Sequence, residues 1–394
     1  MNRIKKVCGS LILAASLVAG LTAAAPASKA AASNDDLKNL GTLLETVKTA
    51  TNAVVASVPT ETTSSTEISI MSFKIPISLK TTVDPTSKTA KMEGSAEIPD
   101  AVSAISIISP KLGSLVDKLG IKAGTKKILD YGDLAKKAVY RHNDNLDRYE
   151  VATLPDALAG SSILSSIDAT KLAKLAPVLN VSFKGTDEVT LNIKADGDAL
   201  KAIKSDVTSL VTGLLGDSEY ASLLKELSGK DALQGIDINI TLKADGTTHV
   251  LTQHDIEGTL NVSVSGTPVA IGVNISGKSA TTTQTVTIPE EFTKDAQLIA
   301  GFEAKAGGVN FISKLSGKNT VFSVSGVANT KATSLTIPKS ISKFGKSYSV
   351  SAAAKNAFKK ATKLKTLTIK NATLKKAVKK NPSKYGLKKG VKIK

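Results

Sequence analysis

The segment of this chain that comes nearest to a catalytic signature is 272–279, Gly-Val-Asn-Ile-Ser-Gly-Lys-Ser, which matches the phosphate-binding loop pattern letter for letter. Phosphate binding by that loop needs a buried strand before it and a helix after it, because backbone amides must converge on the phosphates. Here the segment alternates like a strand, and the following 280–284 (Ala-Thr-Thr-Thr-Gln) is unlike the start of a helix. We therefore interpret the match as coincidental.

Three histidines, His142, His249 and His254, are the candidates for general-base or metal chemistry. His249 and His254 are five residues apart, so on a straight strand they face opposite sides, and His142 borders a turn. We expect surface or rim positions for all three. The acidic turn 143–147 lacks the order of a calcium-binding loop, and no Gly-x-Ser-x-Gly elbow is present. The sequence predicts no metal site, no cofactor and no enzymatic activity.

The N-terminus has the three-part order of a secretory signal peptide. Basic Arg3, Lys5 and Lys6 precede an apolar stretch at 7–25, and small residues fill 23–32. We expect residues 1–32 to be a Sec signal peptide, so that the mature chain is secreted or associated with the cell surface. Cys8, the one cysteine, stands at the wrong end of the apolar stretch for lipidation, and the mature chain therefore has no disulfide.

The net charge of +18 is divided unevenly along the chain. Residues 299–394 hold 22 lysines and one acidic residue, a net charge of +21, and residues 1–32 add +4, which leaves −7 for residues 33–298. We infer two domains with a boundary at 298/299, one mildly acidic and one strongly basic.

A segment of charge +21 attracts polyanions over a long range. Export separates the chain from nucleic acid, and the segment has no arginine for base contacts and few aromatics for stacking. Lysine serves phosphate as a point charge, so the expected partner is an anionic cell-wall polymer or membrane surface. The alternative is a solvated surface without a specific partner. The lysines expected to bind the polyanion form pairs: Lys359, Lys360, Lys375, Lys376, Lys379, Lys380, Lys388 and Lys389.

Residues 33–298 begin with apolar residues at helical spacing over 37–55, and alternating runs at 68–79, 128–153, 178–194 and 236–275 follow. Helix-like segments at 155–177, 198–215 and 217–228 interrupt the alternation. Strands of this kind bury one face and expose the other. The sequence predicts an α+β fold, in which a curved antiparallel half-barrel sheet is covered by helices, with a small C-terminal leucine-rich-repeat-like β module.

This order of elements, and above all the run from 236 to 292, resembles the secreted lipoprotein-carrier-like proteins of Gram-positive bacteria, relatives of the LolA/LolB and LppX superfold. The resemblance implies a half-barrel around a hydrophobic cavity that holds a lipid or another apolar ligand. The residues expected to line that pocket are aliphatic and lie on alternating strands: Ile70, Ile77, Ile238, Ile240, Val262, Ile271 and Val273.

Residues 299–394 resemble the BspA-type leucine-rich repeat of clostridial surface proteins. The resemblance rests on Leu-Thr-Ile-Pro at 335–338, Gly-Lys-Ser-Tyr-Ser-Val at 345–350, Asn-Ala-Phe at 356–358 and Leu-Lys-Thr-Leu-Thr-Ile at 364–369. It implies that Leu335 and Ile337, and then Leu367 and Ile369, form successive strands of a small solenoid. A solenoid needs about three repeats to be stable, and we expect residues 310–333 to serve as an N-terminal strand cap.

These observations together predict an exported, non-enzymatic protein that holds an apolar ligand and associates with the anionic cell envelope through its basic module. The alternative is a structural or adhesive surface protein without a small-molecule ligand. An apolar pocket of roughly several hundred Å³ distinguishes a carrier from a scaffold with a filled core.

Overall fold

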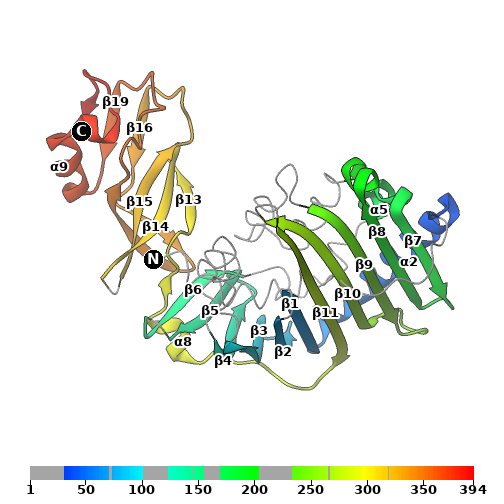
Figure 1. Ribbon diagram of the computed structural model, residues 1–394. Coiled ribbons are helices and arrows are strands. Elements are labelled where there is room, and N and C mark those ends of the chain that lie inside the picture. Colours follow the sequence, from blue (N-terminus) through cyan, green and yellow to red (C-terminus); the bar gives the residue numbers. More distant parts are fainter. Residues whose placement is uncertain are drawn as a thin grey trace. The chain divides into compact units, whose positions relative to one another are not determined.

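The computed structural model describes residues 31–70, 73–100, 123–144, 146–154, 169–203, 233–264, 267–317 and 319–394. The expected signal peptide, apart from its last two residues, and the expected helix 217–228 lie outside these ranges, as does most of the expected helices 155–177 and 198–215. Two compact units are present (Figure 1): residues 136–153 and 289–394 belong to the smaller, and residues 31–135 and 154–288 to the larger. The expected boundary at 298/299 stays a prediction.

The expected α+β fold with covering helices is wrong, because the protein is mostly β. Of the described residues, 53% are in strands and 20% in helices. The expectation underestimated the length of the strands in 233–281 and the strand content of the C-terminal part. Apart from α2 (Asn34–Ser57), the helices given as elements within the described ranges have five to nine residues, or a single 3₁₀ turn.

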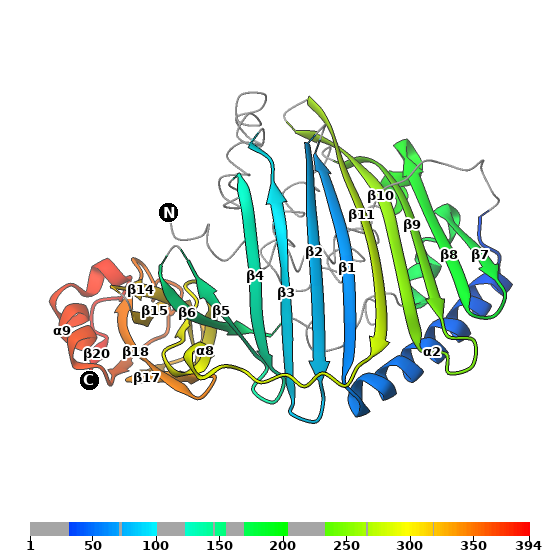
Figure 2. The ribbon, with the colours of Figure 1, turned by 90° about the horizontal axis from the view of Figure 1, so that it is seen from below.

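A curved antiparallel sheet forms the larger unit (Figure 2). Its expected strands at 68–79, 178–194 and 236–275 are confirmed. The nine strands follow the order β4 (Gly124–Asp133), β3 (Thr89–Ile98), β2 (Phe73–Asp84), β1 (Thr60–Ile70), β11 (Thr267–Thr281), β10 (Leu251–Val264), β9 (Leu233–Ala244), β8 (Glu188–Asp196) and β7 (Leu179–Lys184).

Helix α2 begins at a capping box, in which the side chain of Ser33 accepts from the Asp36 amide and the side chain of Asp36 accepts from the Ser33 amide. Its buried residues Leu40, Leu44 and Val47 recur at helical spacing, which confirms the expected amphipathic helix. The helix packs against β7, β10 and α5 (Ala169–Lys174), which precedes the 3₁₀ turn η5 (Ala176–Val178). The Leu251 amide of β10 donates to the Thr51 hydroxyl of α2 over 2.9 Å.

The segment 282–288 runs along the ends of β1 to β4 (Figure 2). It is held by buried Asp84, whose carboxylate accepts from the Thr86 amide at 3.0 Å and from the Val286 amide at 3.4 Å. The hydroxyl of Thr89 donates to the Val286 carbonyl over 2.7 Å. One carboxylate therefore joins the turn after β2 to a segment about 200 residues further along the chain.

The smaller unit combines a hairpin from the middle of the chain with the C-terminal residues. Its elements are α8 (Glu290–Lys294), α9 (Ala372–Lys380), the 3₁₀ turn η6 (Pro382–Tyr385) and strands in three groups. The first group is β5 (Ala138–Asn143), β6 (Arg148–Thr153) and β12 (Gln297–Leu298). The second group follows the order β13 (Glu303–Ala306), β14 (Val309–Ser316), β15 (Asn319–Val327), β18 (Lys346–Ala353) and β17 (Ser340–Lys343). The third group is β16 (Ser334–Ile337), β19 (Thr366–Ile369) and β20 (Lys392–Ile393).

The expected pairing of two short C-terminal strands is confirmed. β16 and β19 run parallel, with Leu335 opposite Leu367 and Ile337 opposite Ile369. The expected cap region 310–333 contains the β14–β15 hairpin, and β15 pairs in parallel with β18. The fully buried side chains of Phe311, Phe322 and Phe358 fill the core. The resemblance to a leucine-rich repeat stays a prediction.

Candidate binding surfaces

One face of the large sheet is lined with aliphatic side chains in rows that cross the strands. Residues that pair directly in an antiparallel sheet point to the same face, as do residues two apart on one strand. A central row therefore consists of Ala96, Ile77, Thr66, Ile275 and Ile256, contributed by β3, β2, β1, β11 and β10. All five side chains are buried.

Five of the seven residues expected to line the pocket fall into two groups. Ile77 lies in the central row, and Val273 and Ile271 follow Ile275 along the same face of β11; Ile77 and Val273 are buried and Ile271 is half-buried. Buried Ile238 and Ile240 pair with Ile193 and Leu191 of β8.

The two remaining expected pocket residues are Ile70, at the end of β1, and Val262, in β10, and their side chains lie outside the described structure. Exposed fractions of 2–5% for Ile77, Ile238, Ile240 and Val273 mean that protein atoms cover these side chains. A ligand at this face must therefore take the place of some of those atoms.

Thr66 interrupts the aliphatic row between Ile77 and Ile275. It is 1% exposed, and its hydroxyl has no hydrogen-bond partner among the described residues. An unsatisfied buried hydroxyl costs about 1–3 kcal/mol. The sequence holds no signal for this residue, because a threonine in an alternating strand is ordinary.

His254 occupies the same face as Ile256, two residues before it on β10. It pairs with Gly277 of β11, and a Cβ atom added at Gly277 would collide with the imidazole ring. The ring therefore leans over the glycine, toward Ser64 of β1 on the far side of β11. Burial lowers the pKa of His254 and the neighbouring Asp255 opposes this effect only in part. The side chain of His254 is half-buried, so the expected surface or rim position stays a prediction for this histidine.

The phosphate-loop match at 272–279 lies wholly inside β11, where its backbone pairs with β1 and β10. Its amides therefore point sideways into the sheet and do not converge on one point, so the interpretation of the match as coincidental is confirmed. Within the described ranges, no three His, Cys, Asp or Glu side chains are grouped as a metal site would require.

His142 lies at the turn after β5, where its Nδ1 atom is 2.9 Å from Asp144 and its Nε2 atom 3.5 Å from Asp147. Both carboxylates are almost fully exposed to solvent. The imidazole also packs edge-on against Tyr149. His249 adopts a left-handed backbone conformation beside the turn between β9 and β10. The expected surface position holds for His142, and we see no catalytic arrangement around it.

Lysine side chains cover the exposed side of α9. Leu374 and Val378 are buried on one side of this helix, and at 3.6 residues per turn the four lysines at positions 375, 376, 379 and 380 fall within an arc of about 140° on the other side. The side chain of Asn371 fixes the start of the helix by accepting from the Leu374 amide at 3.0 Å and donating to Ser349 of β18 at 3.3 Å.

The other expected polyanion-binding lysines come from two segments that are hydrogen-bonded to each other. The Asn356 amide donates to the Lys384 carbonyl and the Phe358 amide to the Tyr385 carbonyl. Gly386 lies so close to the backbone of Lys359 that a Cβ atom there would be 2.8 Å from its nitrogen. Lys359 and Lys360 thus adjoin the segment that carries Lys384, Lys388 and Lys389.

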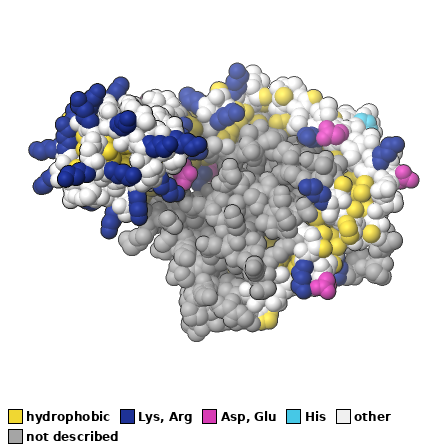
Figure 3. Space-filling view, turned by 90° about the horizontal axis from the view of Figure 1, so that it is seen from above, with side chains coloured by type: hydrophobic (Ala, Val, Ile, Leu, Met, Phe, Trp, Pro, Cys, Tyr) yellow, Lys and Arg dark blue, Asp and Glu magenta, His cyan; other side chains and the backbone are white. Residues whose placement is uncertain are grey.

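Of the eight expected lysines, Lys375 is half-buried and the other seven are exposed. We call these eight residues the lysine face. In the space-filling view, lysine side chains gather over the C-terminal module (Figure 3). Lys346 is different: its ammonium group donates to the carbonyls of Lys294 and Ala296 at 2.6 and 3.0 Å, and burial lowers its pKa. Lys346 therefore has a structural role.

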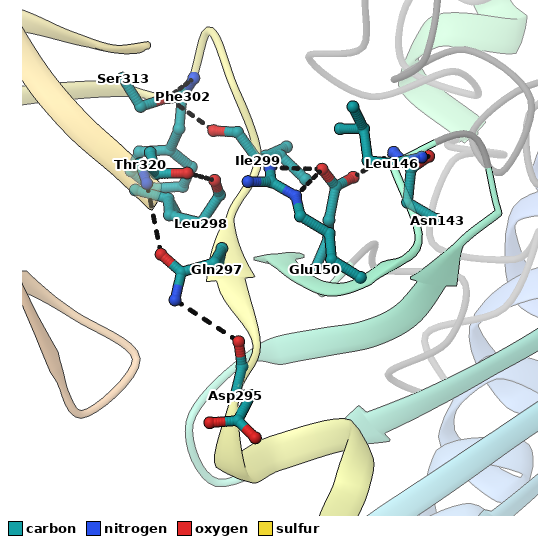
Figure 4. Close-up of polar contacts among 11 residues, drawn as sticks. Asn143, Leu146, Glu150, Asp295, Gln297, Leu298, Ile299, Phe302, Ser313 and Thr320 are labelled. Atoms are coloured by element: carbon teal, nitrogen blue, oxygen red, sulfur yellow. Dashed lines mark hydrogen bonds and ion pairs between the residues drawn. The ribbon is translucent and has the colours of Figure 1, made fainter. Parts of the chain in front are cut away.

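A buried ion pair anchors the hairpin of the smaller unit (Figure 4). Arg148 and Glu150 are 11% and 7% exposed and approach to 2.6 Å, and Asn143 donates to the second oxygen of Glu150 at 2.9 Å. β12 pairs in parallel with β6, the strand of the hairpin that carries Glu150, and Gln297 lies opposite Glu150. The Leu298 and Ile299 carbonyls in turn accept from Thr320 and Ser313. The network joins the hairpin to β14 and β15.

No family model matches the sequence, and no curated protein matches it either. Among solved structures, an uncharacterized conserved protein from Thermus thermophilus is 9% identical, with a TM-score of 0.21 over 66% of this chain and 96% of that one. A structure from work on dehydratase substrate selection for the borrelidin and fluvirucin polyketide synthases is 10% identical, with a TM-score of 0.11 over 59% and 79% of the two chains. Scores this low carry no argument about function.

None of the helices within the described ranges combines the length and the apolar character that crossing a bilayer requires.

Proposed function

We propose that the protein is an exported, non-enzymatic binding protein that associates with an anionic polymer or surface of the cell envelope through its lysine face. The observation that carries this proposal is the concentration of 22 lysines against one acidic residue in 299–394, with four lysines on a single side of α9. Charges that are close and unpaired raise the local potential and concentrate polyanions. Secretion is itself part of the proposal and rests on the N-terminal sequence.

The geometry of α9 favours a phosphate-bearing polymer. Lys375 and Lys379, like Lys376 and Lys380, are one helical turn apart, which corresponds to about 6 Å along the axis. Lys379 and Lys380 also lie in the last turn, where the helix dipole stabilises cationic side chains. Such a row presents regularly spaced point charges to successive phosphates, which lysine binds without the bidentate geometry of arginine.

A second function, apolar-ligand binding in the larger unit, is favoured by the aliphatic face. Its rows contain isoleucine, leucine and valine on at least five neighbouring strands, with Thr66 as an unsatisfied polar group among them. A scaffold needs no such group in its core. The structural or adhesive alternative predicts a filled aliphatic core that takes up no ligand.

Retention of the mature protein on isolated Gram-positive cell walls tests the first function. The Debye length falls from roughly 14 to 4 Å between about 50 and 500 mM salt, so retention should fall steeply over that range. The variant Lys375→Gln/Lys376→Gln/Lys379→Gln/Lys380→Gln should lose most of the salt-sensitive part.

A matched control removes four exposed lysines of other elements, Lys305, Lys314, Lys331 and Lys339, and changes the net charge by the same amount. Equal loss in both variants would show that net charge alone attracts the wall. Retention that does not depend on salt would contradict the proposal.

A further inference from the structure

Thr66 and His254 are polar side chains on the face of the large sheet that carries the aliphatic rows. Thr66 is fully enclosed between Ile77 and Ile275, and its hydroxyl finds no partner within the described residues. Another buried threonine of this unit is satisfied, because the Thr51 hydroxyl accepts from the Leu251 amide. Buried polar groups in folded proteins are nearly always hydrogen-bonded, so this exception calls for a partner outside the described residues, which a bound molecule can supply.

His254 is the second of these polar side chains. Gly277, which has no side chain, leaves the space into which the imidazole leans, and the ring thus extends across β11 toward β1. Thr66 and His254 belong to strands separated only by β11, about 10 Å apart between backbones. The lean of the ring shortens the separation between the imidazole and the Thr66 hydroxyl. Ser64, two residues before Thr66 on β1 and opposite Gly277, lies on the same face, so a polar part of the face adjoins the aliphatic rows.

We propose that Thr66 and His254 form the polar end of a ligand site on this face, for a molecule with a long aliphatic body and one uncharged hydrogen-bonding group, such as an alcohol, ester or amide. The inference rests on the proposed apolar-ligand function and specifies its ligand class. The aliphatic body lies along the isoleucine rows, and the polar group meets the Thr66 hydroxyl, which can both donate and accept, and the imidazole.

The surroundings of this locality select against a charged head group. Burial favours the neutral imidazole, which offers one donor and one acceptor. In the row that contains Thr66, a cationic side chain occurs at Lys126 of β4, three strands away from Thr66. Burying an ionised carboxylate without a close cation is very costly, whereas an alcohol or ester needs only the hydrogen bonds that Thr66 and His254 supply.

Uptake of n-octanol and of n-nonane, which match in length, tests the proposal. The full mature protein is equilibrated with either vapour, and headspace gas chromatography measures saturable uptake. We expect the wild type to prefer octanol, and Thr66→Val and His254→Leu each to lower the octanol-to-nonane preference by about fivefold, as the loss of one hydrogen bond implies. Uptake of nonane should persist in both variants.

Thr82→Val is the matched control, because Thr82 is a buried threonine on the opposite face of β2 from Ile77. It should leave the preference unchanged, and a thermal melt establishes that each variant is folded. Saturable uptake with an unchanged preference in Thr66→Val and His254→Leu would overturn the polar site and leave the apolar-ligand function standing. No saturable uptake of either compound by the folded wild type would overturn both.

Discussion

The imidazole of His254 fills the space above Gly277, where any other residue would place its Cβ atom. The pair makes glycine necessary at this point of β11, although glycine in a strand interior costs about 0.5–1 kcal/mol relative to alanine.

Gly277→Ala should therefore destabilise the protein by about 1–3 kcal/mol, the usual cost of overpacking. In a His254→Ala background the same change should be neutral or stabilising, because the ring is no longer there. Urea unfolding of the two single variants and the double variant measures the coupling. If the two changes in unfolding free energy simply add in the double variant, His254 and Gly277 are not coupled.

The lowered pKa of His254 predicts a loss of stability in mild acid. Burial holds the folded-state pKa below that of the unfolded chain, about 6.5. As the pH falls below that value, the unfolded state takes up a proton that the folded state does not, so stability falls by at most about 1.4 kcal/mol for each pH unit until the folded pKa is reached.

A comparison of the wild type with His254→Gln at pH 7.5 and 5.5, by thermal denaturation, checks this prediction. The wild type should lose more stability on acidification than the variant. The same loss in both proteins would mean that other groups cause it.

Asp84 should stabilise the segment 282–288 at neutral pH. Burial alone would raise the pKa of this carboxyl, but the hydrogen bonds from Ser87, Val286 and Thr86 together lower it. Its contribution is therefore present above the unfolded pKa of about 3.9 and is lost as the pH falls through the lowered folded pKa. Asp84→Asn should cost about 1–3 kcal/mol at pH 7.

The cost of Asp84→Asn should be smaller at about pH 3 than at pH 7, because the wild-type carboxyl takes up a proton as the pH falls toward its lowered folded pKa. Asp196→Asn, at an exposed position at the end of β8, is the control and should have little effect. Urea unfolding at both pH values measures the difference. An equal cost at both would contradict the role given to the carboxylate charge.

Glu150→Ala should destabilise the smaller unit by about 3–5 kcal/mol, because it removes the buried carboxylate that Arg148 and Asn143 contact. Hydrogen exchange of the Thr320 and Ile299 amides, which lie in the connected network, reports the effect locally. Glu303→Ala removes an exposed carboxylate from the same unit and should leave exchange unchanged. Unchanged exchange in Glu150→Ala would mean that the ion pair contributes nothing to the unit.

Local patterns predicted the local structure. Alternation identified β1, β2, β7, β8 and β9, and helical spacing with an acidic start identified α2, because each signal depends on one face of one element. The pairing of Leu335 with Leu367 followed from a repeat pattern. The fold class was wrong because strand content accumulates over many short elements such as β13 and β17, whose patterns are weak.

The contacts that matter most for the candidate sites join distant parts of the chain. The Thr66 hydroxyl lacks a partner within the described part of the chain, and its neighbour Ile275 comes more than 200 residues later, a pairing that periodicity does not give. The inward position of His254 depends on the register that places it opposite Gly277. The lysine face was easier to predict, since charge composition and the spacing at 375–380 are visible without any long-range contact.

The most direct test of the central claim is a titration of the mature protein with a soluble polyglycerol phosphate over a series of salt concentrations. Counterion release makes the logarithm of the binding constant fall linearly with the logarithm of the salt concentration, with a slope of about −0.7 for each phosphate neutralised on a single-stranded polyanion. If the lysine face holds the polymer, neutralising the four lysines of α9 should make that slope less negative by about 2–3 units. The control variant at Lys305, Lys314, Lys331 and Lys339 should keep a slope near that of the wild type. Equal slopes in all three proteins, or no binding by the wild type at about 50 mM salt, would contradict the claim.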